Sequence, residues 1–330
     1  MIIDANTHGF HGGYFGPLLK LGGKWAKQVV DTDIENARPR PQLHNPKLRL
    51  EQMDRFGIDY QVVTPGHWID PDRYPGAART KMAIASALND NMAKVMEVGK
   101  GRLLAVGTIS LLGFEQRGKQ EMERALKLGL KGFSVASNII GKPLDIFGPF
   151  WETAEELDAP IYIHPRHPQT YQGRQYEKDF GLVSSLGWPY ETALALARLV
   201  YSGVMKRHPK LKIISHHLGG GMIPFYMGRM REWIESSYET NTATDAADMI
   251  KQFGLFYHDT VVGMNAPAVR CAIDVFRTER LVFATDAPWG VRCAEERLAN
   301  YPKLIKSLGL SQKETDAIFA DNIRRALKLA

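Results

Sequence analysis

The chain has 330 residues, of which 44% are hydrophobic, 24% charged and 10% aromatic, a composition typical of a globular protein whose core needs no disulfide. Its two cysteines, Cys271 and Cys293, match no metal-binding or redox spacing, and no apolar run approaches the roughly 18 residues of a membrane span, so we expect a cytoplasmic protein without membrane or secretory segments. The net charge of +6 comes without a long basic run interleaved with aromatic residues, which argues against nucleic acid as a partner but fits a small anionic substrate.

Strand-like and helix-like segments alternate from one end of the chain to the other. Short apolar runs predict strands at 2–5, 60–64, 103–109, 132–136, 160–164, 211–215, 255–258 and 280–285. Helices are predicted at 45–57, 77–99, 114–128, 146–158, 191–206, 224–236, 243–252 and 266–276, and a capping box at Ser311 and Glu314 opens helices in the tail. Strands separated by helices in this way predict a parallel sheet, most simply a closed (β/α)8 TIM barrel of the α/β class in one domain that spans residues 1–330.

Two long segments of polar or mixed composition follow the first and fifth strands. They cover residues 9–44 and 165–187, and we expect both to be long loops. Loops of that length in a compact domain are usually either functional or disordered. Because both follow strands that end in candidate ligands, they are predicted to cover the mouth of the barrel.

Three of the predicted strands stop near a histidine or an aspartate: His8 follows the first, His164 ends the fifth and Asp286 follows the eighth. In a β/α barrel the C-terminal ends of the strands meet at one mouth, so these side chains can converge although they are far apart in sequence. Two imidazoles and a carboxylate suit a catalytic Zn or Mn ion that keeps an open coordination position. Asn6 precedes His8 by two residues, and on an extended backbone both side chains point the same way.

A pair of histidines, His216 and His217, ends the sixth strand before the glycine triplet at 219–221. One of two neighbouring strand-end residues should face the barrel mouth and the other the surrounding helices. We assign function to His217, the later residue, and a packing or supporting role to His216. Close approach of the backbone explains the glycine triplet more simply than phosphate binding does.

Several different short motifs occur along the chain in a characteristic combination. They lie at 161–165, 189–193, 199–203, 208–213, 217–220, 224–229, 280–286 and 322–326. With them, almost the whole chain resembles the amidohydrolase-related superfamily, in the branch that contains 2-amino-3-carboxymuconate-6-semialdehyde decarboxylase and the non-oxidative aromatic acid decarboxylases. The combination is specific to that branch and not to one substrate.

The resemblance implies a (β/α)8 barrel, one divalent metal ion, a homodimer or homotetramer, and His217 as the residue that handles the proton. Members of the family carry His-x-His on the first strand, or Glu-x-Ala in some aromatic decarboxylases, where this sequence has Asn6-Thr7-His8. If Asn6 binds the ion, its carbonyl oxygen is a weaker and harder ligand than imidazole, which would move the preference from Zn toward Mn or Mg. Alternatively, a water takes its place.

Residues near the predicted mouth are candidates for contacting the substrate. The resemblance implies that Arg229, after the glycine triplet, can reach across a dimer interface to a substrate carboxylate, since Arg suits bidentate binding of carboxylates. A surface Arg in a salt bridge is an equally good interpretation. Trp289 follows Asp286 by three residues and is the strongest of the others. The remaining candidates are Phe10, His67, His167 and Trp188.

The leading hypothesis is metal-dependent non-oxidative decarboxylation of an aromatic or unsaturated carboxylic acid, with His217 and the nearby Asp286 supplying the proton that replaces the carboxyl group. The same ion and ligands also suit hydrolysis or hydration by a metal-bound hydroxide, with Asp286 or His217 as the general base. A metal-poor barrel that binds a ligand without catalysis is the third hypothesis, and only the missing first-strand histidine supports it.

Overall fold

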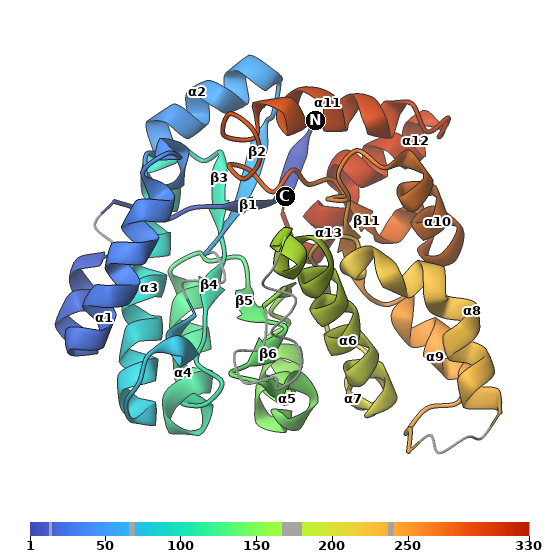
Figure 1. Ribbon diagram of the computed structural model, residues 1–330, viewed down its shortest axis with the longest axis horizontal. Helices are drawn as coiled ribbons and strands as arrows, with labels where there is room; N and C mark the ends of the chain where they lie inside the picture. The colour runs from blue at the N-terminus through green and yellow to red at the C-terminus, as the bar shows by residue number, and fades with distance from the viewer. Residues whose placement is uncertain (13–14, 66–69, 167–179, 237–240, 330) are drawn as a thin grey trace.

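The computed structural model describes residues 1–12, 15–65, 70–166, 180–236 and 241–329 (Figure 1). Its strands are β1 (Ile3–His8), β2 (Tyr60–Thr64), β3 (Leu103–Ala105), β4 (Gly107–Thr108), β5 (Phe133–Ala136), β6 (Asn138–Ile139), β7 (Lys142–Pro143), β8 (Ile161–His164), β9 (Ile213–Ser215), β10 (Tyr257–Asp259) and β11 (Leu281–Val282). Its α-helices are α1 (Phe15–Ala37), α2 (Pro46–Phe56), α3 (Ala78–Val98), α4 (Phe114–Lys127), α5 (Gly148–Glu156), α6 (Trp188–Tyr201), α7 (Val204–Arg207), α8 (Met222–Glu235), α9 (Ala246–Phe253), α10 (Ala266–Phe276), α11 (Glu295–Lys306), α12 (Gln312–Asp316) and α13 (Asn322–Leu327).

Parallel pairing of the strands follows the order of a (β/α)8 barrel. Strands β1, β2 and β3 pair in that order, and β4, β5, β8, β9, β10 and β11 form a second parallel sheet, also in chain order. Only Val106 separates β3 from β4, and its N–H donates to the carbonyl of Val63 in β2. On the other side, the N–H of Ala5 in β1 donates to the carbonyl of Phe283, just after β11. The last strand therefore lies against the first, as the predicted fold requires.

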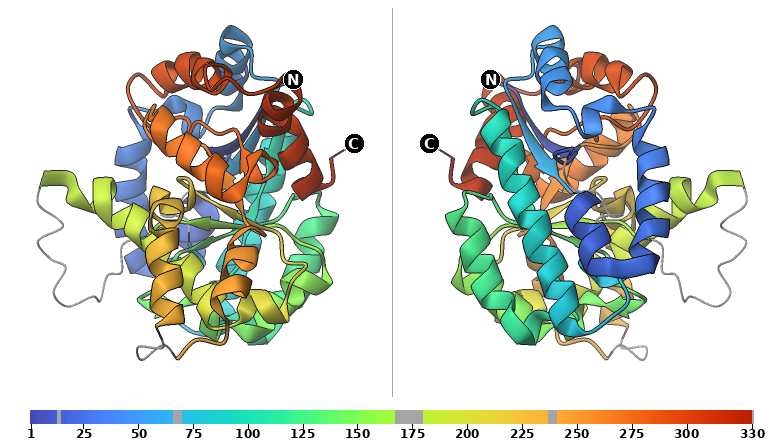
Figure 2. Two further views of the ribbon diagram at one scale, coloured as in Figure 1. Left: turned by 90° about the vertical axis from the view of Figure 1, so that its right-hand side faces the viewer. Right: turned by 90° about the vertical axis from the view of Figure 1, so that its left-hand side faces the viewer.

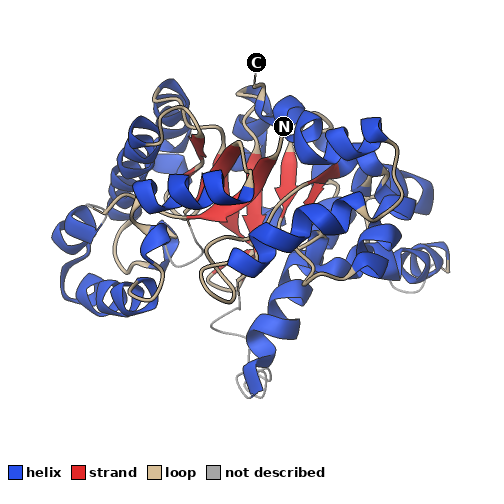
Figure 3. Ribbon diagram, turned by 90° about the horizontal axis from the view of Figure 1, so that it is seen from above, coloured by secondary structure: helices blue, strands red, loops and turns tan. Residues whose placement is uncertain are grey.

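Helices surround the strands, which occupy the middle of the molecule (Figure 3). Helices α1, α3 and α4 lie on one side of the view in Figure 1, and α8, α9 and α10 lie on the other. The segment that leads into α6 projects away from the body (Figure 2) and exposes Phe180 and Leu186. In the part of the chain that the structure describes, no helix combines the length and the apolarity that crossing a membrane would require.

Most predicted helices and strands occur within a few residues of their predicted positions. Helix α2 begins after Asn45, whose side chain accepts hydrogen bonds from the N–H groups of Lys47 and Leu48, and it ends at Gly57 with a φ of 68°. The predicted capping box between Ser311 and Glu314 opens α12.

The prediction of a long loop over residues 9–44 was wrong, because this segment contains α1. Leu18, Ala26, Val30 and Ala37 recur at helical spacing and are buried in one core cluster. Three glycines and several charged residues within α1 itself give it a composition that resembles a loop. Helix α11 was also missed. The second predicted loop, over 165–187, falls largely on residues 167–179, which lie outside the described residues.

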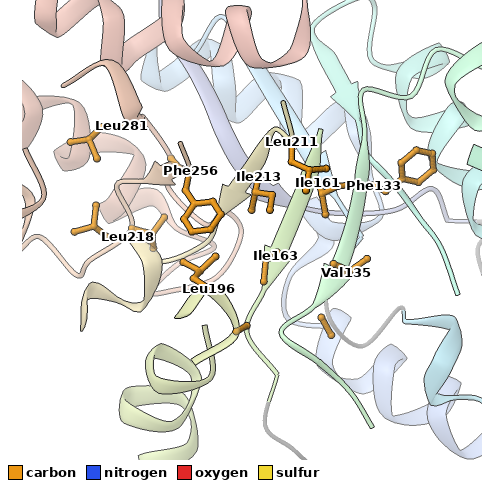
Figure 4. Close-up of a cluster of buried hydrophobic side chains, with 14 of the residues drawn as sticks. Phe133, Val135, Ile161, Ile163, Leu196, Leu211, Ile213, Leu218, Phe256 and Leu281 are labelled. Atoms are coloured by element: carbon orange, nitrogen blue, oxygen red, sulfur yellow. The ribbon is translucent and has the colours of Figure 1, made fainter. Parts of the chain in front are cut away.

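Side chains along the strands alternate between the barrel interior and the helices. The interior cluster contains Ile3, Ala5, Val62, Val106, Tyr162, Ile214, Tyr257 and Val282. The cluster against the helices includes Phe133, Ile161, Ile163, Ile213 and Leu281, together with Leu196 from α6 (Figure 4). Because the period of a strand is two, the residues two positions after Tyr162, Ile214 and Tyr257 also point toward the interior, at the mouth.

Candidate metal centre

Imidazoles from the ends of three strands meet at the mouth of the barrel. One ring nitrogen from each of His8, His164 and His216 lies within 4.8 Å of the other two, and all three residues are buried. The ring centroids of His8 and His164 are 5.0 Å apart, and those of His164 and His216 are 4.8 Å apart. These residues come from β1, β8 and the end of β9, so the barrel joins positions that are distant in the sequence.

Hydrogen bonds decide which nitrogen of His8 and of His164 can act as a ligand. The Thr64 hydroxyl donates to the carbonyl of Thr7 at 3.0 Å and lies 3.0 Å from Nδ1 of His8, so that Nδ1 carries the proton. In His164, Nδ1 lies 2.8 Å from the carbonyl oxygen of Pro165 and donates to it. Both residues therefore keep the lone pair on Nε2, which is the form that binds a metal ion.

Asp286 adds a negative charge at the same point. Its Oδ1 lies 3.0 Å from Nε2 of His8, and two lone pairs so close require a cation, either a second imidazole proton or a metal ion. Burial alone raises the pKa of Asp286, but a hydrogen bond from a protonated His8, the positive charges that His217 and His8 carry when protonated, and the charge of Arg297 outweigh it and hold this pKa well below its usual range. Asp286 is therefore ionised at neutral pH.

Arg297, in the first turn of α11, holds the second oxygen of Asp286. Its Nη1 donates to Oδ2 of Asp286 at 2.8 Å and to the carbonyl of Thr285 at 3.3 Å. Gly290, with a φ of 104°, leaves room for this side chain, since a Cβ there would lie 3.0 Å from Nε of Arg297. Among the described residues, no hydrogen bond engages Nε or Nη2 of Arg297.

Both histidines of the pair after β9 face this region. His216 points into the barrel because Ile214, two residues earlier, does so. His217 and Leu218 have φ angles of 55° and 56°, left-handed conformations that bring His217 into the wall of the cavity beside Asp286. Burial is the main cause of a lowered pKa in both imidazoles, with His8 adding to the effect and Asp286 opposing it, so both are neutral at neutral pH.

Close backbone approach explains the central glycine of the triplet, Gly220. The triplet forms a short 3-10 turn, Gly219–Gly221. A Cβ at Gly220, where φ is 74°, would lie 2.0 Å from the carbonyl oxygen of Pro189 at the start of α6.

Asn6 is oriented by Asp259, a buried residue at the end of β10. Its Nδ2 donates to Oδ2 of Asp259 at 2.8 Å, while its Oδ1 is buried without a hydrogen bond to any described residue. The other oxygen of Asp259 accepts from the N–H groups of Leu218 at 3.2 Å and Val261 at 3.0 Å. Burial raises the pKa of Asp259 to about 7 against these hydrogen bonds. Asp259 therefore ties the end of β1 to the turn that carries His217.

This set of donors fits one divalent metal ion. The imidazoles are held in the tautomer that ligation needs, a carboxylate faces one of them, and neither ring nitrogen of His216 has a hydrogen-bond partner among the described residues. Nitrogen ligands combined with a carboxylate are the donors that Zn and Mn sites use in proteins.

A cavity of about 430 Å³ adjoins the cluster, and we call it the site cavity. Its walls are formed by His164, Ser184, Trp188, His217, Val261, Gly263, Asp286, Trp289 and Arg297. Trp188 and Trp289, two of the residues predicted to contact the substrate, line this cavity. Cζ of Arg40 lies 4.4 Å from the centre of the Trp289 ring. Aromatic walls with a few charged groups suit a small, flat, anionic ligand.

The other predicted substrate contacts lie elsewhere. Phe10 is buried and lines a different cavity, of about 450 Å³, together with Phe15 and His44. Arg229 is exposed on α8, and its Cζ lies 6.0 Å from the ring of Trp233. His67 and His167 lie outside the described residues.

Three residues at this site were not predicted from the sequence. Strand β9 is apolar on both faces, so its composition does not reveal that His216 rather than Ser215 points inward. Asp259 is an acid that directly follows a predicted strand, so its position in the sequence is a signal that could have identified it. Arg297 lies on helix α11, so no strand end in the sequence indicates its position at the site.

Comparison with known proteins gives consistent matches along the chain. The family profile described as amidohydrolase matches residues 3–329. A gamma-resorcylate decarboxylase of Polaromonas sp. is 30% identical over 317 residues, which cover 91% of this chain and 92% of the relative. A 2-amino-3-carboxymuconate-6-semialdehyde decarboxylase of Dictyostelium discoideum is 28% identical over 254 residues, which cover 74% of this chain and 67% of the relative.

Solved structures match the fold over its full length. The 5-carboxyvanillate decarboxylase of Sphingomonas paucimobilis has a TM-score of 0.82 at 21% identity and covers 100% of this chain and 99% of its own. A dihydroxybenzoic acid decarboxylase of Polaromonas sp., with bound manganese and the inhibitor 2-nitroresorcinol, has a TM-score of 0.78 at 23% identity and covers 99% and 97% of the two chains. At these identities the similarity establishes the shared fold.

Proposed function

Because this chain belongs to the amidohydrolase family, we propose that it is a metal-dependent non-oxidative decarboxylase, a carboxy-lyase that acts on a small aromatic or unsaturated carboxylic acid. The convergence of His8, His164 and Asp286 beside a cavity with aromatic walls is the observation that carries the proposal. The names of the relatives support it, since the two described above are decarboxylases.

The cofactor in this proposal is one divalent ion, Zn or Mn, held by His8, His164 and Asp286. The bound manganese of the related dihydroxybenzoic acid decarboxylase supports this part of the proposal. When bound, such an ion supplies a Lewis acid that orients the oxygen atoms of the substrate. Thr64 and the carbonyl of Pro165 keep the two imidazoles in their ligating tautomer, and Arg297 keeps Asp286 in place.

His217 has the role of proton donor. An N–H bond of its imidazolium breaks as the new carbon–hydrogen bond forms at the carbon that carries the carboxylate. The carbon–carbon bond to the carboxylate then breaks, CO2 leaves, and the electron pair of that bond stays with the product. Because the imidazole is neutral in the free protein, His217 first takes up a proton from solvent or substrate.

Arg297 has the role of substrate anchor within the site cavity. Its Nη1 is bound to Asp286, and its remaining N–H groups are available to a carboxylate or phenolate oxygen. Trp188 and Trp289 provide flat apolar walls that match an aromatic ring and exclude water from the carboxylate.

The proposal also includes an oligomeric state and a location: the enzyme is a homodimer or homotetramer in the cytoplasm. Helix α8 exposes Phe225, Tyr226 and Trp233 close to Arg229, an apolar surface that a second copy of the chain would cover. In that arrangement Arg229 contacts a substrate in the neighbouring copy. Both cysteines are free, which suits a reducing compartment.

The test is CO2 release from a panel of hydroxybenzoic and unsaturated carboxylic acids, with lactones and amides as substrates for the hydrolase alternative. Metal-stripped enzyme and enzyme reloaded with Mn or Zn are compared. The proposal predicts metal-dependent release of CO2 from at least one acid. Turnover of lactones or amides alone would establish the hydrolase alternative, and failure of the purified protein to bind either ion would establish the non-catalytic one.

A further inference from the structure

We propose that His216 is a ligand of the metal ion, in the position where Asn6 of the first strand would otherwise bind. This inference rests on the proposed metal-dependent function, because it assigns the coordination of the same ion. It adds a donor from the sixth strand of the barrel to those from the first, fifth and eighth strands.

The position of His216 relative to His8 and His164 is the first observation that supports this inference. A ring nitrogen of His216 lies within 4.8 Å of the ligating atoms of both His8 and His164, close enough for one ion to contact all three. The ring of His216 stacks over that of His8 with their centroids 6.0 Å apart and their planes 20° from parallel. Strand alternation after Ile214 gives the side chain this direction, so the backbone and not a flexible rotamer sets it.

The two ring nitrogens of His216, which lack hydrogen bonds among the described residues, are the second supporting observation. His216 has no exposed surface, and neither Nδ1 nor Nε2 forms a hydrogen bond within the described residues. A buried polar atom without a partner calls for an explanation, and a bound ion is one of the few available. A metal ion would engage one of these nitrogens where no protein group does.

Asn6 is the competing donor, and its contacts weaken its claim. Its amide nitrogen is bound to Asp259, which fixes the orientation of the side chain. Its Oδ1 is buried and without a hydrogen bond among the described residues, so it could also face an ion. An amide oxygen is nevertheless a weaker ligand than imidazole for Zn or Mn.

The experiment measures Mn²⁺ affinity by competition with a chelating dye, using metal-stripped full-length protein. His216→Phe keeps an aromatic ring and removes both nitrogens. His258→Phe is the matched control, because His258 is also a fully buried strand-end histidine with an unpaired Nε2, but it packs on Phe276 outside the barrel. Asn6→Ala tests the competing donor.

We expect His216→Phe to weaken Mn²⁺ binding at least about 10-fold and His258→Phe to leave it within about 2-fold of the unsubstituted protein. Asn6→Ala should cause a smaller loss than His216→Phe. Affinity of the His216→Phe protein within about 3-fold of the unsubstituted protein, or a larger loss in Asn6→Ala, would overturn the inference.

A spectroscopic readout applies even if His216→Phe fails to fold. Pulsed electron paramagnetic resonance of the Mn²⁺-loaded, unsubstituted protein reports the nitrogen nuclei bound to the ion. Imidazole couplings from three histidines support the inference, and couplings from only two contradict it. If the unsubstituted protein binds neither Mn²⁺ nor Zn²⁺, the proposed function fails together with the inference. If it binds Mn²⁺ and releases CO2 while His216→Phe retains full affinity, the inference alone fails.

Discussion

Two buried histidines at the ends of neighbouring strands, His216 after β9 and His258 in β10, occupy opposite sides of the barrel wall. His216 lies inside, among His8, His164 and Tyr162. His258 lies outside, where its ring stacks on Phe276 at 4.0 Å between centroids. Both side chains are fully buried, and burial is the first cause of a lowered pKa in each.

The two histidines differ in the groups that surround each imidazole ring. Nδ1 of His258 is hydrogen-bonded to the Ser215 hydroxyl at 2.7 Å, and the ring packs against the aromatic rings of Phe256 and Phe276. Its Nε2 is unpaired all the same, within the described residues. An unpaired buried nitrogen therefore does not identify a metal site by itself. Convergence with other ligating atoms does, and among the residues that the structure describes, the histidines that converge in this way lie in the interior of the barrel.

The largest effect is expected from the interior residue that handles the proton. His217→Asn should lower kcat about 10²- to 10⁴-fold, because it removes the donor that protonates the substrate carbon. The metal ligands are unchanged, so elemental analysis should find the same metal content as in the unsubstituted enzyme. Full activity in this variant would remove His217 from the mechanism and would leave the interior region without an acid.

The second largest effect is expected when a metal ligand inside the barrel is removed and compared with a histidine outside it. His164→Ala should weaken Mn²⁺ binding by at least about 100-fold, since a ligand contributes no less than the groups that orient it. The measurement is dye competition on metal-stripped protein, with His208→Ala as the control, because His208 pairs with Glu155 at 3.1 Å on the outside of the barrel. Equal losses in both variants would show that general destabilisation, not ligation, controls metal binding.

Arg297 tests whether the site cavity holds an anionic substrate. Arg297→Met should raise KM about 10- to 100-fold. This change corresponds to the loss of one hydrogen bond to a charged group, which contributes about 1.5–3 kcal/mol. Because Nη1 also holds Asp286, metal content must be measured alongside. Arg297→Lys should recover part of the loss by restoring the charge. A normal KM in the Met variant would exclude Arg297 from substrate binding.

The smallest effect is expected for His258, outside the barrel, and it is a change in how the free energy of unfolding depends on pH. Burial lowers the pKa of His258 to about 3; the backbone carbonyl of Phe253 opposes this decrease, and the charge of Arg280 adds to it. The unfolded chain takes up this proton near pH 6.5, so the stabilising contribution is complete above that pH and is lost as the pH falls toward 3. His258→Phe should remove up to about 1.4 kcal/mol per pH unit from the slope of the free energy of unfolding in this window.

Urea unfolding at pH 7 and pH 5 measures this slope. Within the same variant, metal affinity and turnover should stay as they are in the unsubstituted protein. An unchanged slope would show that His258 is protonated in the folded state, and a loss of metal would contradict the separation of the two regions.

The sequence predicts the strands and their polar ends well, since short apolar runs that stop at His8, His164 and Asp286 are local signals. It does not predict the inward face of β9, because a strand buried on both sides has no polar alternation to read. Helix α1 was missed because its apolar stripe is diluted by glycine and charged residues, and Arg297 because its position at the site depends on how α11 packs. The sequence therefore identifies the strands and most of the helices, but it does not give the direction of side chains on a fully buried strand, and it misses the two helices α1 and α11.

Anomalous diffraction from crystals of the Mn²⁺-loaded protein tests most directly whether distant strand ends share one ion. We predict a single strong peak enclosed by the side chains of His8, His164, His216 and Asp286. Crystals saturated with Mn²⁺ that show no density among these residues, or a peak only elsewhere, would contradict it.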